Sequence, residues 1–396
     1  MKSAILVLSI TACAGSRDPI SSVGDVASIR VFDEGTGVEG RIAIFQDRNG
    51  EIRKQVRTGS DGIATSSIRP GDMVTLANVG APKFDLTTYV DLQPSDVGIV
   101  GETETEDKPK FWADLVRVSL PEPPPGAMRG HVGAGLALTP QEGAATAVRL
   151  IEGDNGASYV VGVATDASGA PVAFTTLETS SGTKAVALPA WRTDWHRVDV
   201  RLPNLAPSAV TKVSVEAISG DARFPALAAP GPAITMLIPS GIGRAMDTQI
   251  VIDDGGARRS WRRVSALANE VTLDAADLLP PVTQVAITRG VRPTVTWSTR
   301  SVDAAAVVVI RLSWGEGDAH RWTVIAPAAI RSFQFPALPD ELALWRPGVE
   351  VRVGVGLLQS SELAGYHAVM RHGIEELDVE DGATLRTSTY GDLELP

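Results

Sequence analysis

Short runs of alternating hydrophobic and polar residues, separated by turn residues, recur along most of this 396-residue chain. Residues 29–32, 41–45 and 52–58 follow one another in this way, and an Asn-Gly pair at 49–50 lies between the last two. Asn-Gly tolerates the positive φ of a type I′ turn, so it predicts a hairpin. Alternation with period two is typical of strands with one buried face. The pattern predicts the all-β fold class, with tandem β-sandwich domains.

The same signal returns in the second half of the chain. Residues 248–252 and 258–264 are expected to form a hairpin that turns at Asp-Asp-Gly-Gly, residues 253–256. The stretch 258–263 reads Arg-Arg-Ser-Trp-Arg-Arg and is the one strongly basic patch. We interpret it as a solvated edge strand whose charge prevents pairing with other strands, and the alternative is an anion site. Gly354 and Gly356 are interpreted as positions of close packing or of bulges within a strand.

Changes in composition divide the chain. The proline run at 121–125 predicts a stiff polyproline II spacer, and it is the clearest candidate boundary. The expected divisions are a lipoprotein signal peptide at 1–12, a tether at 13–24, a first β-sandwich at 25–119, a Pro-rich linker at 120–127, a middle β-rich domain at 128–268, a last β-sandwich at 269–377 and a C-terminal tail at 378–396.

Cys13 is the single cysteine, and it follows Ile10-Thr11-Ala12 and an apolar run at 4–8. This arrangement resembles the lipobox of bacterial lipoproteins, in which the cysteine thiol becomes acylated. The resemblance implies lipidation of Cys13 and a location in the bacterial cell envelope, anchored at the outer membrane or cell surface. The alternative is an ordinary buried cysteine. One cysteine excludes an intrachain disulfide, so the cores must be held by packing.

Two further resemblances concern the sandwiches. Val-Glu-Gly at 38–40, the Asn-Gly hairpin and the segment 58–64 together resemble carboxypeptidase-regulatory-like and related immunoglobulin-like modules. That resemblance implies an accessory module without peptidase activity. The segments 292–298, with Trp297, and 345–353 resemble a fibronectin type III domain, although the corner tyrosine of that family is replaced by Val351.

The net charge of −11 repels polyanions, so nucleic acid is not expected as a partner. The expected partners are a membrane, through lipidated Cys13, and other envelope proteins or polysaccharide. The five histidines are dispersed and lack metal-ligand spacing, and the sequence lacks a G-x-S-x-G elbow and a phosphate-binding glycine loop. His367 and His372 are interpreted as surface residues on or near a final strand. We therefore expect no catalytic residue, no metal and no cofactor.

Trp191 and Trp195 precede a predicted strand and are four residues apart, which on an extended chain places both rings on one face. Exposed rings there would stack on sugars, whereas core packing is the commoner fate of tryptophan. The function expected from the sequence is a non-catalytic, lipid-anchored envelope protein for surface display, adhesion or protein assembly. The alternatives are a carbohydrate-binding accessory lipoprotein that uses these tryptophans, and a hydrolase built from distant residues.

Overall fold

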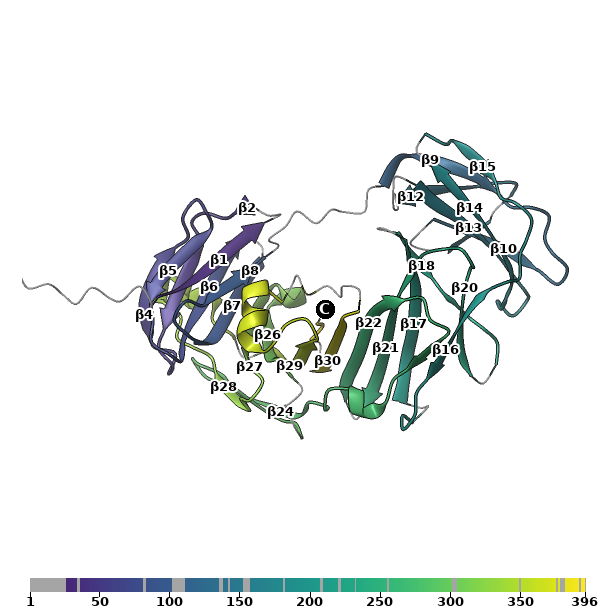
Figure 1. Ribbon diagram of the computed structural model, residues 1–396. Coiled ribbons are helices and arrows are strands. Elements are labelled where there is room, and N and C mark those ends of the chain that lie inside the picture. Colours follow the sequence, from purple (N-terminus) through teal and green to yellow (C-terminus); the bar gives the residue numbers. More distant parts are fainter. Residues whose placement is uncertain are drawn as a thin grey trace, which may run out of the picture.

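The computed structural model describes residues 26–395, with gaps at 34–35, 81–82, 102–110, 135–137, 142, 152–156, 181, 207–208, 220–221, 232, 255, 301–304, 349, 375–376, 378–381 and 392. Cys13 and the expected leader and tether lie outside these residues. Of the residues that the structure describes, 57% lie in strands and 6% in helices. The predicted all-β class of tandem sandwiches is confirmed (Figure 1).

In the described part of the chain the strands form six sheets, and the four cores between their faces define four two-sheet sandwiches. The first sandwich has β1 (Val26–Asp33), β2 (Thr36–Gly37), β5 (Ile63–Ser67) and β8 (Val97–Val100) in one sheet, and β3 (Ile42–Gln46), β4 (Ile52–Arg57), β6 (Asp72–Gly80) and β7 (Lys83–Leu92) in the other. The second has β9 (Phe111–Ser119), β12 (Thr146–Ile151) and β15 (Ala185–Ala187) facing β10 (Arg129–Gly133), β11 (Leu138–Pro140), β13 (Ala157–Thr165) and β14 (Pro171–Ser180).

The third and fourth sandwiches follow without a break. The third has β16 (His196–Arg201), β19 (Leu227–Ala228), β20 (Ile234–Ile238) and β23 (Glu270–Thr272) facing β17 (Val210–Ser219), β18 (Ala222–Pro225), β21 (Ala245–Asp254) and β22 (Ala257–Ala266). The fourth has β24 (Thr283–Thr288), β25 (Thr294–Ser298) and β28 (Ser332–Gln334) facing β26 (Val307–Trp314), β27 (His320–Pro327) and β29 (Val351–Ser360). The helix α1 (Tyr366–His372) and the strand β30 (Thr384–Tyr390) come last.

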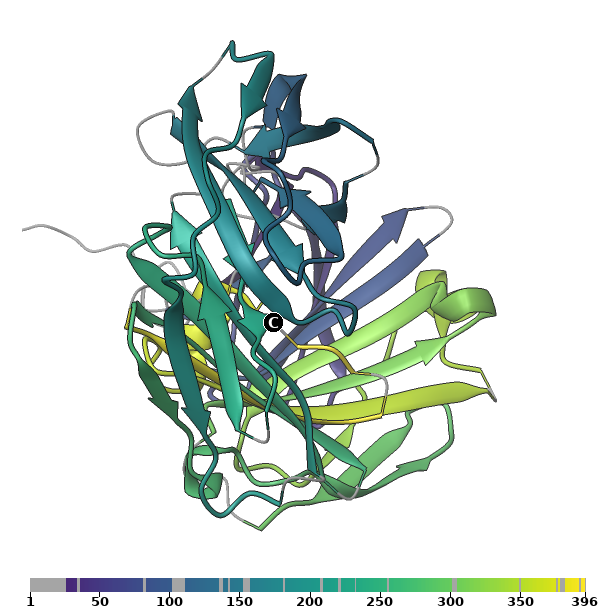
Figure 2. The same cartoon turned by 90° about the vertical axis from the view of Figure 1, so that its right-hand side faces the viewer.

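One sheet of the first, third and fourth sandwiches belongs to a continuous sheet of 12 strands, ordered β18-β17-β21-β22-β30-β29-β26-β27-β7-β6-β3-β4. Two pairings make it continuous. The strand β30 lies between β22 of the third sandwich and β29 of the fourth, antiparallel to both. The strands β7 and β27 pair in parallel and join the first sandwich to the fourth. Figures 1 and 2 show the first and third sandwiches at opposite ends of this twisted sheet, with the second sandwich beside the third.

The strand pairing departs from the expected divisions. The strand β9 was placed at the end of the first unit, but it pairs with β12 and β15, so it belongs to the second sandwich. The proline run at 121–125 therefore connects the two sheets of one sandwich. The stretch taken as one middle domain contains strands of two sandwiches, because β9 to β15 and β16 to β23 form separate sheets. The stretch taken as a tail contains β30, an interior strand.

The two hairpins predicted from the sequence are present in the structure. Both hairpins are confirmed, as β3 pairs with β4 and β21 with β22. In the first turn only Gly50 has positive φ, and the Asp47 carboxylate accepts bonds from the Asn49 and Glu51 amides. The backbone bond from Glu51 is the main reason that the pKa of Asp47 is lowered.

The basic strand β22 is interior and not an edge, because β30 covers its free side and Asp247 on β21 pairs with Arg262.

Glycine and histidine predictions were also resolved. Gly354 and Gly356 lie in β29 at close contacts, since a Cβ on either would meet Leu393 or Leu395 at 2.7 to 2.8 Å. His367 and His372 lie on α1 and not on a strand, because Gly365 and Gly373 delimit one short helix there. No helix among the described residues is long and apolar enough to cross a bilayer.

Strands at the junction of the first and fourth sandwiches are buried on both faces. All five residues of β3 are buried, with Ala43 and Phe45 in the core of the first sandwich and Ile42 and Ile44 in the core of the fourth. A sheet covered on both sides loses the alternation of a half-exposed strand. The junction is thus an interior region of the molecule.

A chain of buried side chains crosses this junction by hydrogen bonds. The Trp322 indole donates to the Thr88 hydroxyl at 2.8 Å, and the Thr88 and Thr75 hydroxyls are 2.8 Å apart. The Thr75 hydroxyl donates to Gln46 Oε1 at 3.1 Å, and Gln46 Nε2 donates to the Ala337 carbonyl at 3.2 Å. The network begins and ends in the fourth sandwich and passes through the first. Polar groups at this depth are costly unless paired, so the network specifies how the two sandwiches meet.

Candidate functional site

Alternation along β26 and β27 places two kinds of side chain on one face of the large sheet. On β26, Val307 and Val309 are followed on that face by Arg311 and Ser313. On β27 the same face carries Arg321 and Thr323 and then the buried Ile325. The apolar end is covered, because Val309 and Ile325 belong to the core beneath β1, β8 and α1. The polar end extends beyond this cover.

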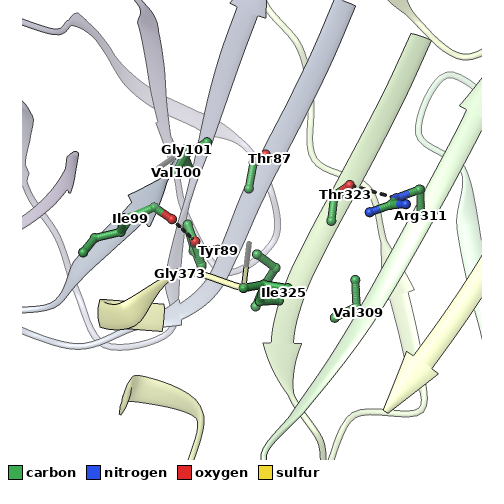
Figure 3. A pocket seen from close by; sticks show the side chains of 11 residues that line it. Thr87, Tyr89, Ile99, Val100, Gly101, Val309, Arg311, Thr323, Ile325 and Gly373 are labelled. Carbon is green, nitrogen blue, oxygen red and sulfur yellow. Dashed lines mark hydrogen bonds between the residues drawn. The ribbon is translucent and has the colours of Figure 1, made fainter. Parts of the chain in front are cut away.

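Register aligns the polar positions of neighbouring strands into two rows. In one row Asp85 of β7 lies opposite Arg321 of β27, which lies opposite Ser313 of β26. In the next row Thr87 lies opposite Thr323, which lies opposite Arg311. Figure 3 shows Thr87, Thr323 and Arg311 at one level on three adjacent strands. Since directly opposed side chains are within contact range, the rows form one continuous polar surface.

This surface is the floor of a cleft of about 160 Å³, called the junction cleft below. Its polar lining comprises Asn78, Asp85, Thr87, Arg311, Arg321 and Thr323. Its wall is formed by Val31 and Phe32 at the end of β1 and by Val100 and Gly101 at the end of β8. A Cβ at Gly101, where φ is +89°, would lie 2.1 Å from the Phe32 carbonyl oxygen, so only glycine allows the two wall strands to end this close together.

Two smaller hollows continue the junction cleft along the same face. One, of about 50 Å³, shares Thr87, Thr323 and Arg311 with it and extends to Gly373 after α1. The other, of about 30 Å³, lies on the far side of Arg311 and includes Asp318 and Arg352. Arg311 therefore lines all three hollows. It is the central cation of the site.

Hydrogen bonds and ion pairs orient the charged side chains. Arg311 Nε donates to the Thr323 hydroxyl at 3.3 Å (Figure 3). Arg321 Nε lies 3.2 Å from Asp85 Oδ1, and these two side chains are 43% and 37% exposed. An ion pair this exposed adds little to stability and leaves both groups accessible to a ligand. Arg352 pairs with Asp318. The cleft thus offers guanidinium and hydroxyl donors beside carboxylate acceptors.

The covered end of this face is pinned by two tyrosines. The Tyr89 hydroxyl donates to the Ile99 carbonyl, and the Tyr366 hydroxyl of α1 contacts Val90 of β7 and Ile325 of β27. Burial raises the pKa of Tyr366 well above its usual value, so this hydroxyl keeps its proton. His367 on the same helix lies 3.0 Å from Asp96. These contacts fix the end wall of the hollow that adjoins Gly373.

Trp191 and Trp195 lie in the connection between the second and third sandwiches. The Trp191 indole donates to the Glu122 carbonyl at 2.7 Å. The Trp195 ring packs on Phe174 with 4.6 Å between ring centroids and joins the core of the third sandwich. Arg192 stacks on Phe174 and pairs with Asp194. Each predicted stacking ring therefore has a separate partner within the chain.

The remaining predicted features are scattered. His131, His196 and His320 lie in three different sandwiches and contact Thr165, the Ala268 carbonyl and Trp345 respectively. In the described part of the chain, no group of three or more His, Cys, Asp or Glu side chains is placed to hold a metal ion. Arg311 and its neighbours were not among the residues predicted from the sequence. The available signal was the change from valine to arginine and serine on one face of β26.

Comparisons with known proteins find only distant likenesses among solved structures. No family model and no curated protein matches the chain. Among solved structures, the Bacillus anthracis TIE protein is 8% identical over 63% of this chain and 50% of that chain, with a TM-score of 0.16. The chicken CNTN1 FN1-FN3 domains are 12% identical over 74% and 91%, with a TM-score of 0.18. This chain spans half the length of the TIE protein, and neither likeness carries information on function.

Proposed function

We propose that this chain is a non-catalytic, lipid-anchored protein of the bacterial cell envelope that serves surface display, adhesion or protein assembly. The observation that carries the proposal is the continuous 12-stranded sheet, which holds three sandwiches in one fixed arrangement. A preorganised surface loses less conformational freedom when a partner binds. Such a platform suits display better than a string of independently moving modules would.

The anchor is the lipobox-like segment ending at Cys13. Acyl chains on that thiol contribute about 0.8 kcal/mol for each buried CH₂, so several chains hold a protein at a membrane where one myristoyl chain is marginal. The protein body carries a net negative charge, which gives it no electrostatic attraction to anionic lipid. Membrane attachment in this proposal therefore depends on the acylated cysteine alone.

Metabolic labelling with palmitate tests the anchor. We expect label in the wild-type chain and in a Ser16→Ala control, and none in Cys13→Ser. The wild-type chain should sediment with membranes and the Cys13→Ser chain should stay in the supernatant. Equal labelling of the three chains, or a supernatant location for the wild type, would overturn the anchor.

Crosslinking in intact cells tests the display and assembly role. A short amine-reactive crosslinker should convert the wild-type chain into discrete larger species, because a fixed surface presents its lysines in one geometry. Cys13→Ser should lose those species if assembly occurs at the membrane. A wild-type chain that gives only monomer while a known envelope complex is captured in the same cells would contradict the role.

A further inference from the structure

We infer that the junction cleft is a binding site for a sugar that carries a carboxylate, that is, a uronic acid. The carboxylate lies against Arg311, and the ring hydroxyls reach Asp85 and Asn78. Clefts where two domains meet are common ligand sites. The inference goes beyond the proposed function and does not depend on the anchor at Cys13.

The volume of the cleft sets the size of the ligand. At about 160 Å³ it has room for about five waters of ~30 Å³ each. That space fits one ring with its substituents and does not fit an extended peptide or a long acyl chain. The hollow toward Gly373, of about 50 Å³, is too small for a second whole ring and has room only for part of one. A monosaccharide or the end residue of a polysaccharide is the matching size.

The arrangement of charge sets the polarity of the ligand. In one row the opposed positions are Thr87, Thr323 and Arg311, a cation beside two hydroxyls. In the adjacent row Asp85 is paired with Arg321. A ligand carboxylate is attracted to the guanidinium of Arg311, which has the planar donors that match it, and it is repelled by Asp85. The carboxylate end therefore lies in the row of Arg311.

The mixture of donors and acceptors selects a polyhydroxylated ligand over a simple acid. Sugar hydroxyls both donate and accept, so they need acceptors such as Asp85 and donors such as Asn78 and Arg321 at the same time. Arg321 and Asp85 keep these capacities because their pair is about 40% exposed. The wall opposite, with Val31, Phe32 and Val100, is apolar and faces the C–H groups of a ring. A small carboxylate without hydroxyls would satisfy only the Arg311 end.

Isothermal titration of the full chain with glucuronate tests this site. Glucose serves as the neutral matched ligand and acetate as the carboxylate without hydroxyls. We expect glucuronate to bind at least about tenfold more tightly than either, because both ends of the cleft are then used. Binding should weaken as salt is raised, since one charged contact carries the orientation. Equal affinity for glucose and glucuronate, or no heat with glucuronate at millimolar concentration, would overturn the proposal.

Variants locate the binding. Arg311→Gln should weaken glucuronate binding by about tenfold or more, and Thr323→Val, which removes the hydroxyl that orients Arg311, by about threefold. Arg289→Gln is the matched control, because Arg289 is an exposed arginine in the turn after β24, outside the cleft lining. Circular dichroism verifies folding, and Thr323→Val keeps the test valid if Arg311→Gln fails to fold. An equal loss in Arg289→Gln and the cleft variants would contradict the site.

Discussion

Two of the joints between sandwiches in this molecule are built differently. The first and fourth sandwiches share a sheet, because β7 and β27 pair through their backbones over six residues from Phe84 opposite His320 to Tyr89 opposite Ile325. The second and third sandwiches meet through side chains, where Val161 and Val163 of β13 pack in the core of the third sandwich with Phe224 of β18. Backbone hydrogen bonds occur at fixed spacing, so they specify register. Apolar contact is non-directional.

We call the joint in which β7 and β27 pair through their backbones the welded joint. The joint in which side chains of the second and third sandwiches pack together is called the packed joint. At the welded joint, the register of β7 and β27 also determines which side chains line the junction cleft. At the packed joint, the aromatic contacts of Tyr159 with Phe224 and of Trp195 with Phe174 hold two complete sandwiches together. We expect a destabilising substitution at the welded joint to unfold the first and fourth sandwiches together. A destabilising substitution at the packed joint should instead separate the second sandwich from the third.

The largest effect is expected at the centre of the welded joint. Trp322→Ala removes a ring that is 1% exposed and that donates to Thr88 across the joint. Loss of a buried tryptophan typically costs about 3 to 5 kcal/mol. Urea unfolding followed by circular dichroism should show one transition at lower urea for the first and fourth sandwiches together. Trp322→Phe, which keeps most of the ring, should lose much less, and independent unfolding of the two sandwiches would refute a welded joint.

A smaller loss of stability, with two unfolding transitions in place of one, is expected at the packed joint. Phe224→Ala removes a buried ring, at a cost of about 3 kcal/mol because the two sandwiches are able to close around the space. Unfolding should split into two transitions, and proteolysis should begin in the connection at 189–195. Phe224→Leu is the control and should keep the wild-type pattern. A single transition for Phe224→Ala would mean that this joint is as cooperative as the other.

Next in size is the buried polar network of the welded joint. Thr88→Val preserves shape but leaves the Trp322 N–H without its acceptor, which costs about 1 to 3 kcal/mol. Thr87→Val on the adjacent residue is the matched control, since Thr87 lies on the opposite face in the junction cleft and its change should cost less than about 0.5 kcal/mol. Chemical denaturation of the two variants side by side measures the difference. Equal losses of stability in the two variants would show that the network does not determine how the two sandwiches meet.

The smallest effect concerns the helix that fastens the welded joint. Tyr366→Phe removes contacts with Val90 and Ile325 and should cost about 1 kcal/mol near neutral pH. The raised pKa of Tyr366 in the folded state contributes stability below the usual tyrosine value of 10.0, and that contribution is lost as pH rises above it. Wild-type stability should therefore fall more steeply than that of Tyr366→Phe above pH 10. Parallel slopes in denaturation series from pH 9 to 11 would contradict this assignment.

Local features were predictable from the sequence because their causes are local. The hairpin of β3 and β4, with its turn at Gly50, and the hairpin of β21 and β22 both join strands that are adjacent in sequence, and both hairpins formed as expected. Trp297, at the position where the fibronectin type III resemblance implies a core tryptophan, is 4% exposed. The close contacts at Gly354 and Gly356 were likewise indicated by glycine inside a strand.

The joints were not predictable in this way. Pairing of β7 with β27 joins residues 236 positions apart, and nothing beside Asp85 indicates Arg321 as its neighbour. The basic strand β22 was predicted to be an edge strand from its own charges. Its actual neighbours, Asp247 on β21 and the strand β30, lie outside that stretch of sequence. The threonine-rich strand β30 has β-branched residues at 384, 387 and 389 that favour a strand, but the signal is weak without its two neighbours. The junction cleft depends on register between sandwiches, so it follows only from the three-dimensional structure.

The placement of β30 has a consequence for the order of events during synthesis. Domains generally fold as the chain emerges, beginning at the N-terminus. Here β7 must wait for β27, and both β22 and β29 keep an open edge until Thr384–Tyr390 has been made. Contacts between such distant segments form slowly, and open strand edges invite pairing with other chains. A chain whose synthesis stops before Thr384 is therefore released with two unpaired strand edges, and keeping those edges from other chains until β30 is made is a task for chaperones.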